Sequence, residues 1–240
     1  EALAVVEGPN FQKIGTKHLS KLYEIIDRTY FKNYLSVIIK SESRVLAFRL
    51  SSRMTQRAGQ LLTDKARPLH HELSISSFLL FETFSSRNNI DNRPITVNGL
   101  QCVNRLQCLL RVLEHELIHL LFCCNAMKKS LRIVDRNGAY VESFHGPTFQ
   151  AAVKRFYGHT GWQHSLVTRD EVAFTQHGIE VGVTISFEYE GKTLRGKVNR
   201  VQQRVTVLVL DNESTGATLF SDGNKYLKYY VPVNHCRVAL

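Results

Sequence analysis

The chain has 240 residues, 43% of them hydrophobic, and no apolar run near the roughly 18 residues of a membrane span, so we expect a two-domain, non-membrane protein. Five cysteines without the spacing of a disulfide scaffold favour a reducing intracellular compartment, the cytoplasm or the nucleus. A formal net charge of +10 favours polyanionic partners, meaning nucleic acid, acidic proteins or anionic surfaces.

Residues 106–124, LQCLLRVLEHELIHLLFCC, repeat apolar side chains at helical spacing and contain the motif H-E-x-x-H. In a helix, His115 and His119 lie four residues apart on one face, where two imidazoles can bind one Zn²⁺. Glu116 follows the first histidine and is placed to take a proton from a metal-bound water. The competing interpretation, a pair of hydrogen-bonded core histidines, is the weaker one because both residues lie off the centre of the apolar stripe.

A catalytic zinc site takes three protein ligands, so one more is needed. Phe122 and Asn125 stand where the metzincin pattern requires glycine and histidine, which excludes that family. A thermolysin-like site would use a later glutamate, for which Glu142 and Glu171 are the candidates.

The stronger candidate for the third ligand is His145, in the segment SFHGPTFQAAVKRFYGHTGW. Proline is favoured at the first position of a helix, and the pattern after Pro147 has apolar residues on one helical face. The sequence therefore predicts that His145 lies at the start of a helix.

H-E-L-I-H followed by H-G-P-x-F resembles the SprT-like, or Spartan-type, zinc metalloprotease family. Upstream, LSKLYEIIDRTYFKNYL resembles the opening helix of that family, SSRMTQRAGQLL its strand and turn, and HHELSISSFLLF the strand before the zinc helix. The resemblance covers about residues 15 to 160. It implies an α+β, zincin-like fold with Zn²⁺ bound by His115, His119 and His145 and with Glu116 as the catalytic base. It also implies a zinc metalloendopeptidase that cleaves DNA-bound or DNA-crosslinked proteins in DNA repair.

The segment between the two motifs contains DRNG, a turn sequence, flanked by LRIV and AYVESF, which predicts a hairpin flap. A fourth ligand from this region would favour the alternative function, a non-proteolytic zinc-containing scaffold in a nucleic-acid assembly. Structural zinc sites are usually closed by four ligands and need no general base. The candidates for that fourth ligand are Asp135, Glu142, Cys123 and Cys124.

Most of the excess positive charge lies in the first part of the chain. Residues 177–240 hold eight Lys and Arg against six Asp and Glu, which leaves 23 against 15 before them. A DNA-binding groove and a scattered, solvated surface are about equally consistent with this distribution, because no run exceeds two consecutive basic residues.

Polar residues 168–178 predict a linker between a metalloprotease domain, residues 1–170, and a β domain, residues 178–240. Alternating segments after the linker predict five short strands and a small SH3-like barrel. The strings GKVNRVQQRVTVLV and FSDGNKY resemble the C-terminal extension of some SprT-like proteins. By default we expect the aromatic residues of this domain to fill its core. The alternatives are a stacking surface for single-stranded nucleic acid or a cage for a modified side chain. These residues are Phe187, Tyr189, Tyr226, Tyr229 and Tyr230.

Overall fold

The structure, a computed structural model, describes residues 1–64, 66–85, 93–124 and 145–239. The chain is mixed α+β and divides into two compact units, Glu1–Leu166 and Val167–Leu240. None of the helices in these described ranges is long and apolar enough to cross a membrane. The predicted flap and two of the candidate ligands, Asp135 and Glu142, lie outside the described residues.

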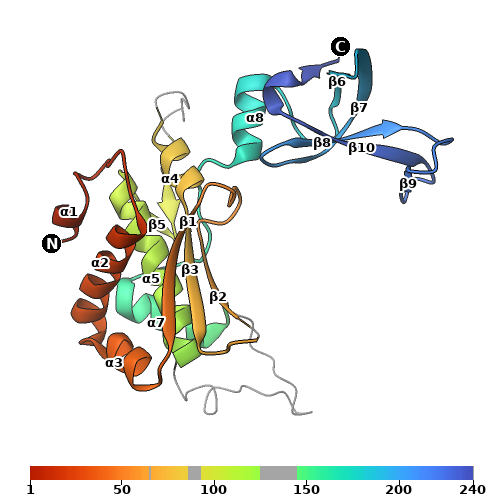
Figure 1. Ribbon diagram of the computed structural model, residues 1–240. Helices are drawn as coiled ribbons and strands as arrows, with labels where there is room; N and C mark the ends of the chain where they lie inside the picture. The colour runs from red at the N-terminus through yellow and green to blue at the C-terminus, as the bar shows by residue number, and fades with distance from the viewer. Residues whose placement is uncertain (65, 86–92, 125–144, 240) are drawn as a thin grey trace. The chain divides into compact units, whose positions relative to one another are not determined.

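A three-stranded mixed sheet and the helices packed on it form the first unit (Figure 1). Its strand order is β1-β3-β2, with β1 parallel and β2 antiparallel to the central strand. A short two-stranded sheet, β4-β5, follows the larger one in the chain. The strands are β1 (Val45–Ser51), β2 (Gly59–Thr63), β3 (His70–Ser76), β4 (Thr96–Val97) and β5 (Leu100–Gln101).

Helix α5 is the centre of this unit, because it contacts β2, β3 and four other helices. Thirteen of its side chains are buried, as expected for a helix with a wide apolar stripe. The helices of the unit are α1 (Ala2–Val5), α2 (Thr16–Ile26), the π-helix η1 (Asp27–Phe31), α3 (Tyr34–Ser41), α4 (Ser77–Thr83), α5 (Arg105–Cys124) and α7 (Pro147–Tyr157).

The expected opening helix is interrupted in the structure. Lys32 and Asn33 have positive φ angles of 54° and 64°, which end the helical path before α3 begins. The buried Asp27 carboxylate accepts hydrogen bonds from the backbone N–H groups of Leu35 and Ser36, at 3.0 and 2.8 Å. It therefore caps the N-terminus of α3, where a negative charge is favourable. Likewise, the segment expected as one strand before the zinc helix forms β3 and then α4.

The second unit contains helix α8 (Arg169–His177) and a six-stranded antiparallel sheet of order β11-β6-β7-β8-β10-β9. This order is open: no pairing in the described part of the unit joins β11 to β9. The elements are β6 (Thr184–Tyr189), β7 (Lys192–Val201), β8 (Val205–Leu210), β9 (Thr218–Leu219), β10 (Lys225–Val231), the 3-10 helix η2 (Val233–His235) and β11 (Arg237–Val238).

The residues expected to form a polar linker are instead helical. The Thr168 side chain accepts a hydrogen bond from the backbone N–H of Glu171 and so caps α8. Ala173, on this helix, and Ile179, just after it, are buried in the core of the second unit. The division between the units therefore falls before α8, at Leu166 and Val167.

Candidate metal centre

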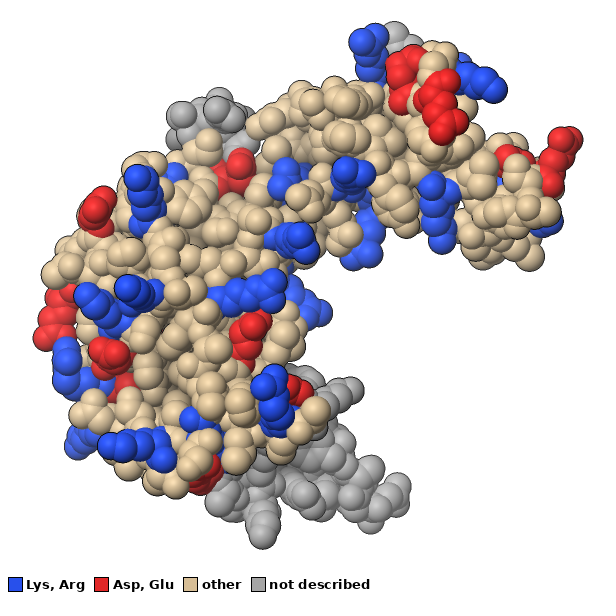
Figure 2. Space-filling model, in the orientation of Figure 1, with Lys and Arg blue, Asp and Glu red and all other residues tan. Residues whose placement is uncertain are grey.

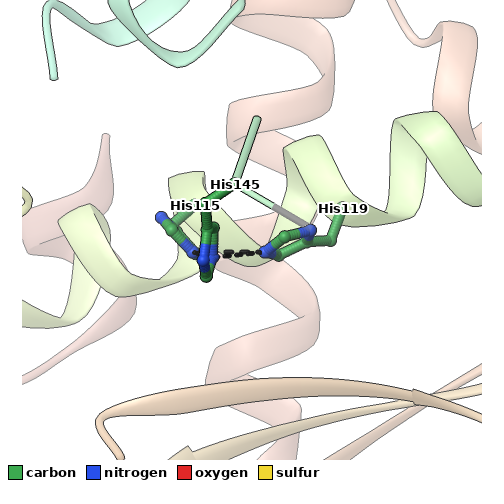
Figure 3. Close-up of side chains that lie close together, drawn as sticks. All are labelled: His115, His119 and His145. Atoms are coloured by element: carbon green, nitrogen blue, oxygen red, sulfur yellow. Dashed lines mark hydrogen bonds between the residues drawn. The ribbon is translucent and has the colours of Figure 1, made fainter. Parts of the chain in front are cut away.

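Three histidine side chains converge on one point between α5 and the start of α7 (Figure 3). His115 Nε2 lies 3.0 Å from His145 Nε2, and His119 Nε2 lies 3.2 Å from each of them. The first two histidines are one helical turn apart on α5. His145 comes from a segment 26 residues further along the chain than His119. The structure thus brings together the three residues that the sequence proposes as ligands.

The spacing of these nitrogens fits a tetrahedral zinc site. Three nitrogens bound to zinc at about 2.0–2.1 Å, with tetrahedral angles, lie roughly 3.3–3.4 Å apart. The observed separations of 3.0–3.2 Å are within a few tenths of an ångström of that triangle. Three converging imidazole nitrogens cannot all be satisfied by hydrogen bonds to one another, whereas one cation accepts a lone pair from each. The site can therefore hold a metal ion.

Burial keeps these imidazoles neutral, the form that binds metals. It lowers the pKa of His115 to about 2, and repulsion from the neighbouring histidines adds to the effect. The pKa of His119 falls to about 4 for the same reasons, and burial also lowers the pKa of His145. A neutral imidazole offers its lone pair without first releasing a proton.

Helix α7 positions His145 and forms one wall of the centre. Gly146 is the N-cap and Pro147 the first helical residue, so the histidine lies just outside the helix start. The Gln150 side chain donates a hydrogen bond of 2.8 Å to the backbone carbonyl of His145. One turn into the helix, the buried Phe149 ring lies 4.3 Å from the His119 ring, 4.9 Å from that of His115 and 5.1 Å from that of His145, measured between centroids. This one side chain packs against all three imidazoles.

Glu116 lies between α5 and the edge strand β2, and its side chain is buried. The backbone N–H of Leu61 donates a hydrogen bond to its carboxylate, which lowers its pKa, but burial outweighs this and raises the pKa to about 8. A Cβ atom at Gly59 would lie 2.7 Å from Glu116 Oε1 and 2.6 Å from Val112 Cγ1. Only glycine therefore lets β2 approach the carboxylate this closely.

A buried ionic network fastens the other end of α7 to α5. The Glu114 carboxylate receives two hydrogen bonds from Arg111 Nη1, at 2.8 and 3.1 Å, and lies 3.0 Å from His159 Nε2. His159 follows α7 and is 1% exposed, and its ring packs at a tilt against that of Tyr157. The network holds both helices in register next to the metal centre.

An exposed aromatic residue stands beside the centre. The Trp162 ring is 48% exposed and lies nearly parallel to the His145 ring, at a centroid separation of 6.2 Å. It offers an apolar surface next to one of the three histidines.

The other candidate ligands that the structure describes are not part of this group. Among the described residues, the only cluster able to hold a metal is the three histidines, so it includes neither Glu171, which lies in the second unit, nor Cys123 nor Cys124. Sequence reasoning missed the roles of Phe149, Gly59 and Leu61. A glycine inside a strand pattern is the one signal that points to such a close approach. Comparison of the chain with protein-family models, curated proteins and solved structures finds no match.

Proposed function

We propose that this chain is a zinc-dependent endopeptidase of the SprT-like type. The observation that carries the proposal is the convergence of three neutral Nε2 atoms, with a buried carboxylate on the same helix as two of them. The combination matters because a structural zinc site has no need of a buried general base. The zincin-like assignment of the first unit and the SH3-like assignment of the second belong to this proposal.

Each part of the centre has a role in peptide hydrolysis. His115, His119 and His145 hold the ion, which when bound supplies Lewis acidity toward a carbonyl group and toward water. Glu116 takes the proton of the attacking water on its carboxylate and delivers it to the leaving amine. The Leu61 N–H orients that carboxylate. In the described part of the chain, strand β2 is the outer strand of its sheet, so an extended peptide can lie along its edge beside the hydrogen bond from Leu61 to Glu116.

The proposed substrates are proteins bound or crosslinked to DNA. Two features support this class: the resemblance of the motifs to the SprT-like family, and the net charge of +10. On the face shown in Figure 2, Lys and Arg side chains of the first unit are spread between Asp and Glu and form no single patch. On this face, the charge of the first unit therefore supports general attraction to a polyanion more than a defined groove.

Glu116→Gln separates metal binding from chemistry. The variant should keep about one equivalent of zinc and its melting temperature, yet lose at least about 10²-fold in cleavage of a DNA-bound protein, because an amide cannot take the proton. Glu24→Gln, the same change at an exposed position of α2, is the matched control and should cleave normally. Zinc is measured by elemental analysis and cleavage by gel electrophoresis.

The other outcomes identify what fails. A wild-type chain without zinc after metal-replete expression contradicts the metal centre itself. A zinc-loaded wild-type chain that cleaves nothing, with or without DNA, favours the non-proteolytic scaffold. Normal cleavage by Glu116→Gln shows that another group is the base.

A further inference from the structure

One face of the sheet in the second unit carries most of that unit's basic side chains. Strand pairing places Arg237 opposite Ser186 and Ser186 opposite Arg195, and it places Lys197 and Lys228 on either side of Leu208. Paired residues point to the same face of a sheet. The basic sheet face is defined here by five exposed residues: Arg195, Lys197, Arg200, Lys228 and Arg237.

A β-bulge is needed to bring Arg200 to this face. Simple alternation along β7 would put Arg200 on the opposite side from Lys197. The register shifts between Val198 and Arg200, so Arg200 pairs with Thr206 and both valines flanking it, Val198 and Val201, still face the core. Alternation in the sequence alone would therefore assign only four of the five cations to this face.

Most acidic residues of the unit lie off this face; Glu188 is on it, because it pairs with Thr193, which strand alternation places on the same face as Arg195. Glu190 lies in the tight turn between β6 and β7, with a positive φ of 49°, and Glu188 lies at the adjoining strand end, where it accepts a hydrogen bond from Thr193. The remaining acidic residues lie outside the strands, on helix α8 or in loops and turns: Asp170, Glu171, Glu180, Asp211, Glu213 and Asp222. The numbers of basic and acidic residues in 177–240 are nearly equal, but cations outnumber acidic residues on this face of the sheet.

The aromatic residues are divided between the two sides of this sheet. Phe187 is buried in the core, and the Tyr229 ring packs against it and against Tyr189. Tyr230, in contrast, is 62% exposed and pairs with Thr206, which pairs with Arg200. An exposed ring therefore lies in the same cross-strand row as a cation, about 10 Å away across two strand spacings.

We propose that the basic sheet face binds single-stranded nucleic acid. From β11 to β10 the cations span four strand spacings, about 19 Å, which suits successive phosphates of an extended strand. In the described part of the chain, Lys197, Arg200, Lys228 and Arg237 form no ion pair with an acidic side chain, so these four can bind phosphate. Tyr230 supplies a ring on which a base stacks. The inference deepens the proposed function by giving its substrates a recruitment surface. Only the recruitment role rests on the proposed endopeptidase function, because binding of nucleic acid to this face is measured without any cleavage.

The test compares two triple variants of the intact chain with equal change in charge. Lys197→Gln, Arg200→Gln and Lys228→Gln together neutralise the basic sheet face. Lys192→Gln, Arg204→Gln and Lys225→Gln neutralise cations of the same unit that lie at strand ends and in a turn. Binding of a fluorescent oligothymidylate is followed by anisotropy at several salt concentrations, and circular dichroism melting checks that each variant is folded.

The face variant should bind at least tenfold more weakly than the parent, while the control variant should stay within about twofold. The salt slope of log affinity should fall by about 2, since each phosphate contact on a single strand contributes roughly 0.7. Tyr230→Leu should weaken oligothymidylate binding severalfold and leave duplex binding unchanged, because a paired base is not free to stack.

Three results would overturn the proposal. An equal loss in both triple variants would mean that only net charge matters. Tighter binding of a duplex of the same length would exclude a single-strand site. Binding of the parent to anionic phospholipid vesicles but not to oligothymidylate would assign the face to a membrane surface. None of these results alters the expected loss of cleavage in Glu116→Gln.

Discussion

Glu116 and the three histidines share one buried site, but burial moves their pKa values in opposite directions. The pKa of the carboxyl rises to about 8, whereas those of His115 and His119 fall to about 2 and 4. Without a metal, all of these groups are therefore predominantly uncharged near pH 7. A cation bound at the histidines would favour the ionised carboxylate, the form that acts as a base.

A pH dependence of stability follows from the carboxyl group. In the unfolded chain Glu116 has the ordinary glutamate pKa of 4.5, whereas in the folded, metal-free chain burial raises this pKa to about 8. The folded state then binds more protons between these values, so this contribution to stability is present below pH 4.5 and is lost as pH rises to 8. Relative to Glu116→Gln, the chelated wild type should lose stability on the order of 2–4 kcal/mol across this range.

Thermal melts of both chelated proteins from pH 5 to 9 provide the measurement. The histidines act in the other direction in both proteins: their stabilisation is present above pH 6.5 and declines as pH falls toward 4, so it cancels in the difference. A difference in melting temperature that does not change with pH would show that Glu116 is not buried as a carboxylic acid.

At the scale of elements, α7 does more than deliver one ligand. Its Phe149 packs against all three imidazoles, whereas Phe156, two turns later on the same helix, packs against Phe31 and Tyr157. Phe149→Ala should cost about 3–5 kcal/mol of stability and weaken zinc affinity at least tenfold, because the three imidazole rings lose the side chain that packs against all of them. Phe156→Ala should lower stability without changing zinc affinity.

Zinc affinity is measured by competition with a chromophoric chelator, and stability by denaturant unfolding. Equal zinc affinities of the two variants would show that Phe149 supports the helix and not the ligands.

Local patterns predicted the part of the site that depends on local geometry. The spacing of His115 and His119 follows from the helical period, and His145 before Gly-Pro follows from the rules of helix starts. The approach of Gly59 and Leu61 to Glu116 joins elements far apart in the chain, and no periodicity encodes it. The helical state of residues 169–177 was missed because their apolar face is short and its partner, the core around Ile179, comes later in the sequence.

For the whole molecule, the division between the units predicts where the chain can be cut. A fragment ending at Leu166 keeps every proposed ligand and base within one compact unit. It should melt cooperatively and bind about one equivalent of zinc. A fragment ending at His177 should be less soluble, because it keeps α8 but removes the core that buries Ala173.

Size-exclusion chromatography, circular dichroism melting and zinc analysis of both fragments check this prediction. An unfolded Leu166 fragment, or one without zinc, would show that the second unit is required for the metal centre to form.

His145 lies 26 positions after His119 in the sequence, which gives the proposed ion a further effect. The ion would act as a crosslink that closes a loop, since His119 lies on α5, His145 lies just before α7, and these two helices are in contact. Loop-closure entropy grows only with the logarithm of length, so doubling such a segment costs about 0.6 kcal/mol. The length of this segment can therefore change at little thermodynamic cost to the metal centre.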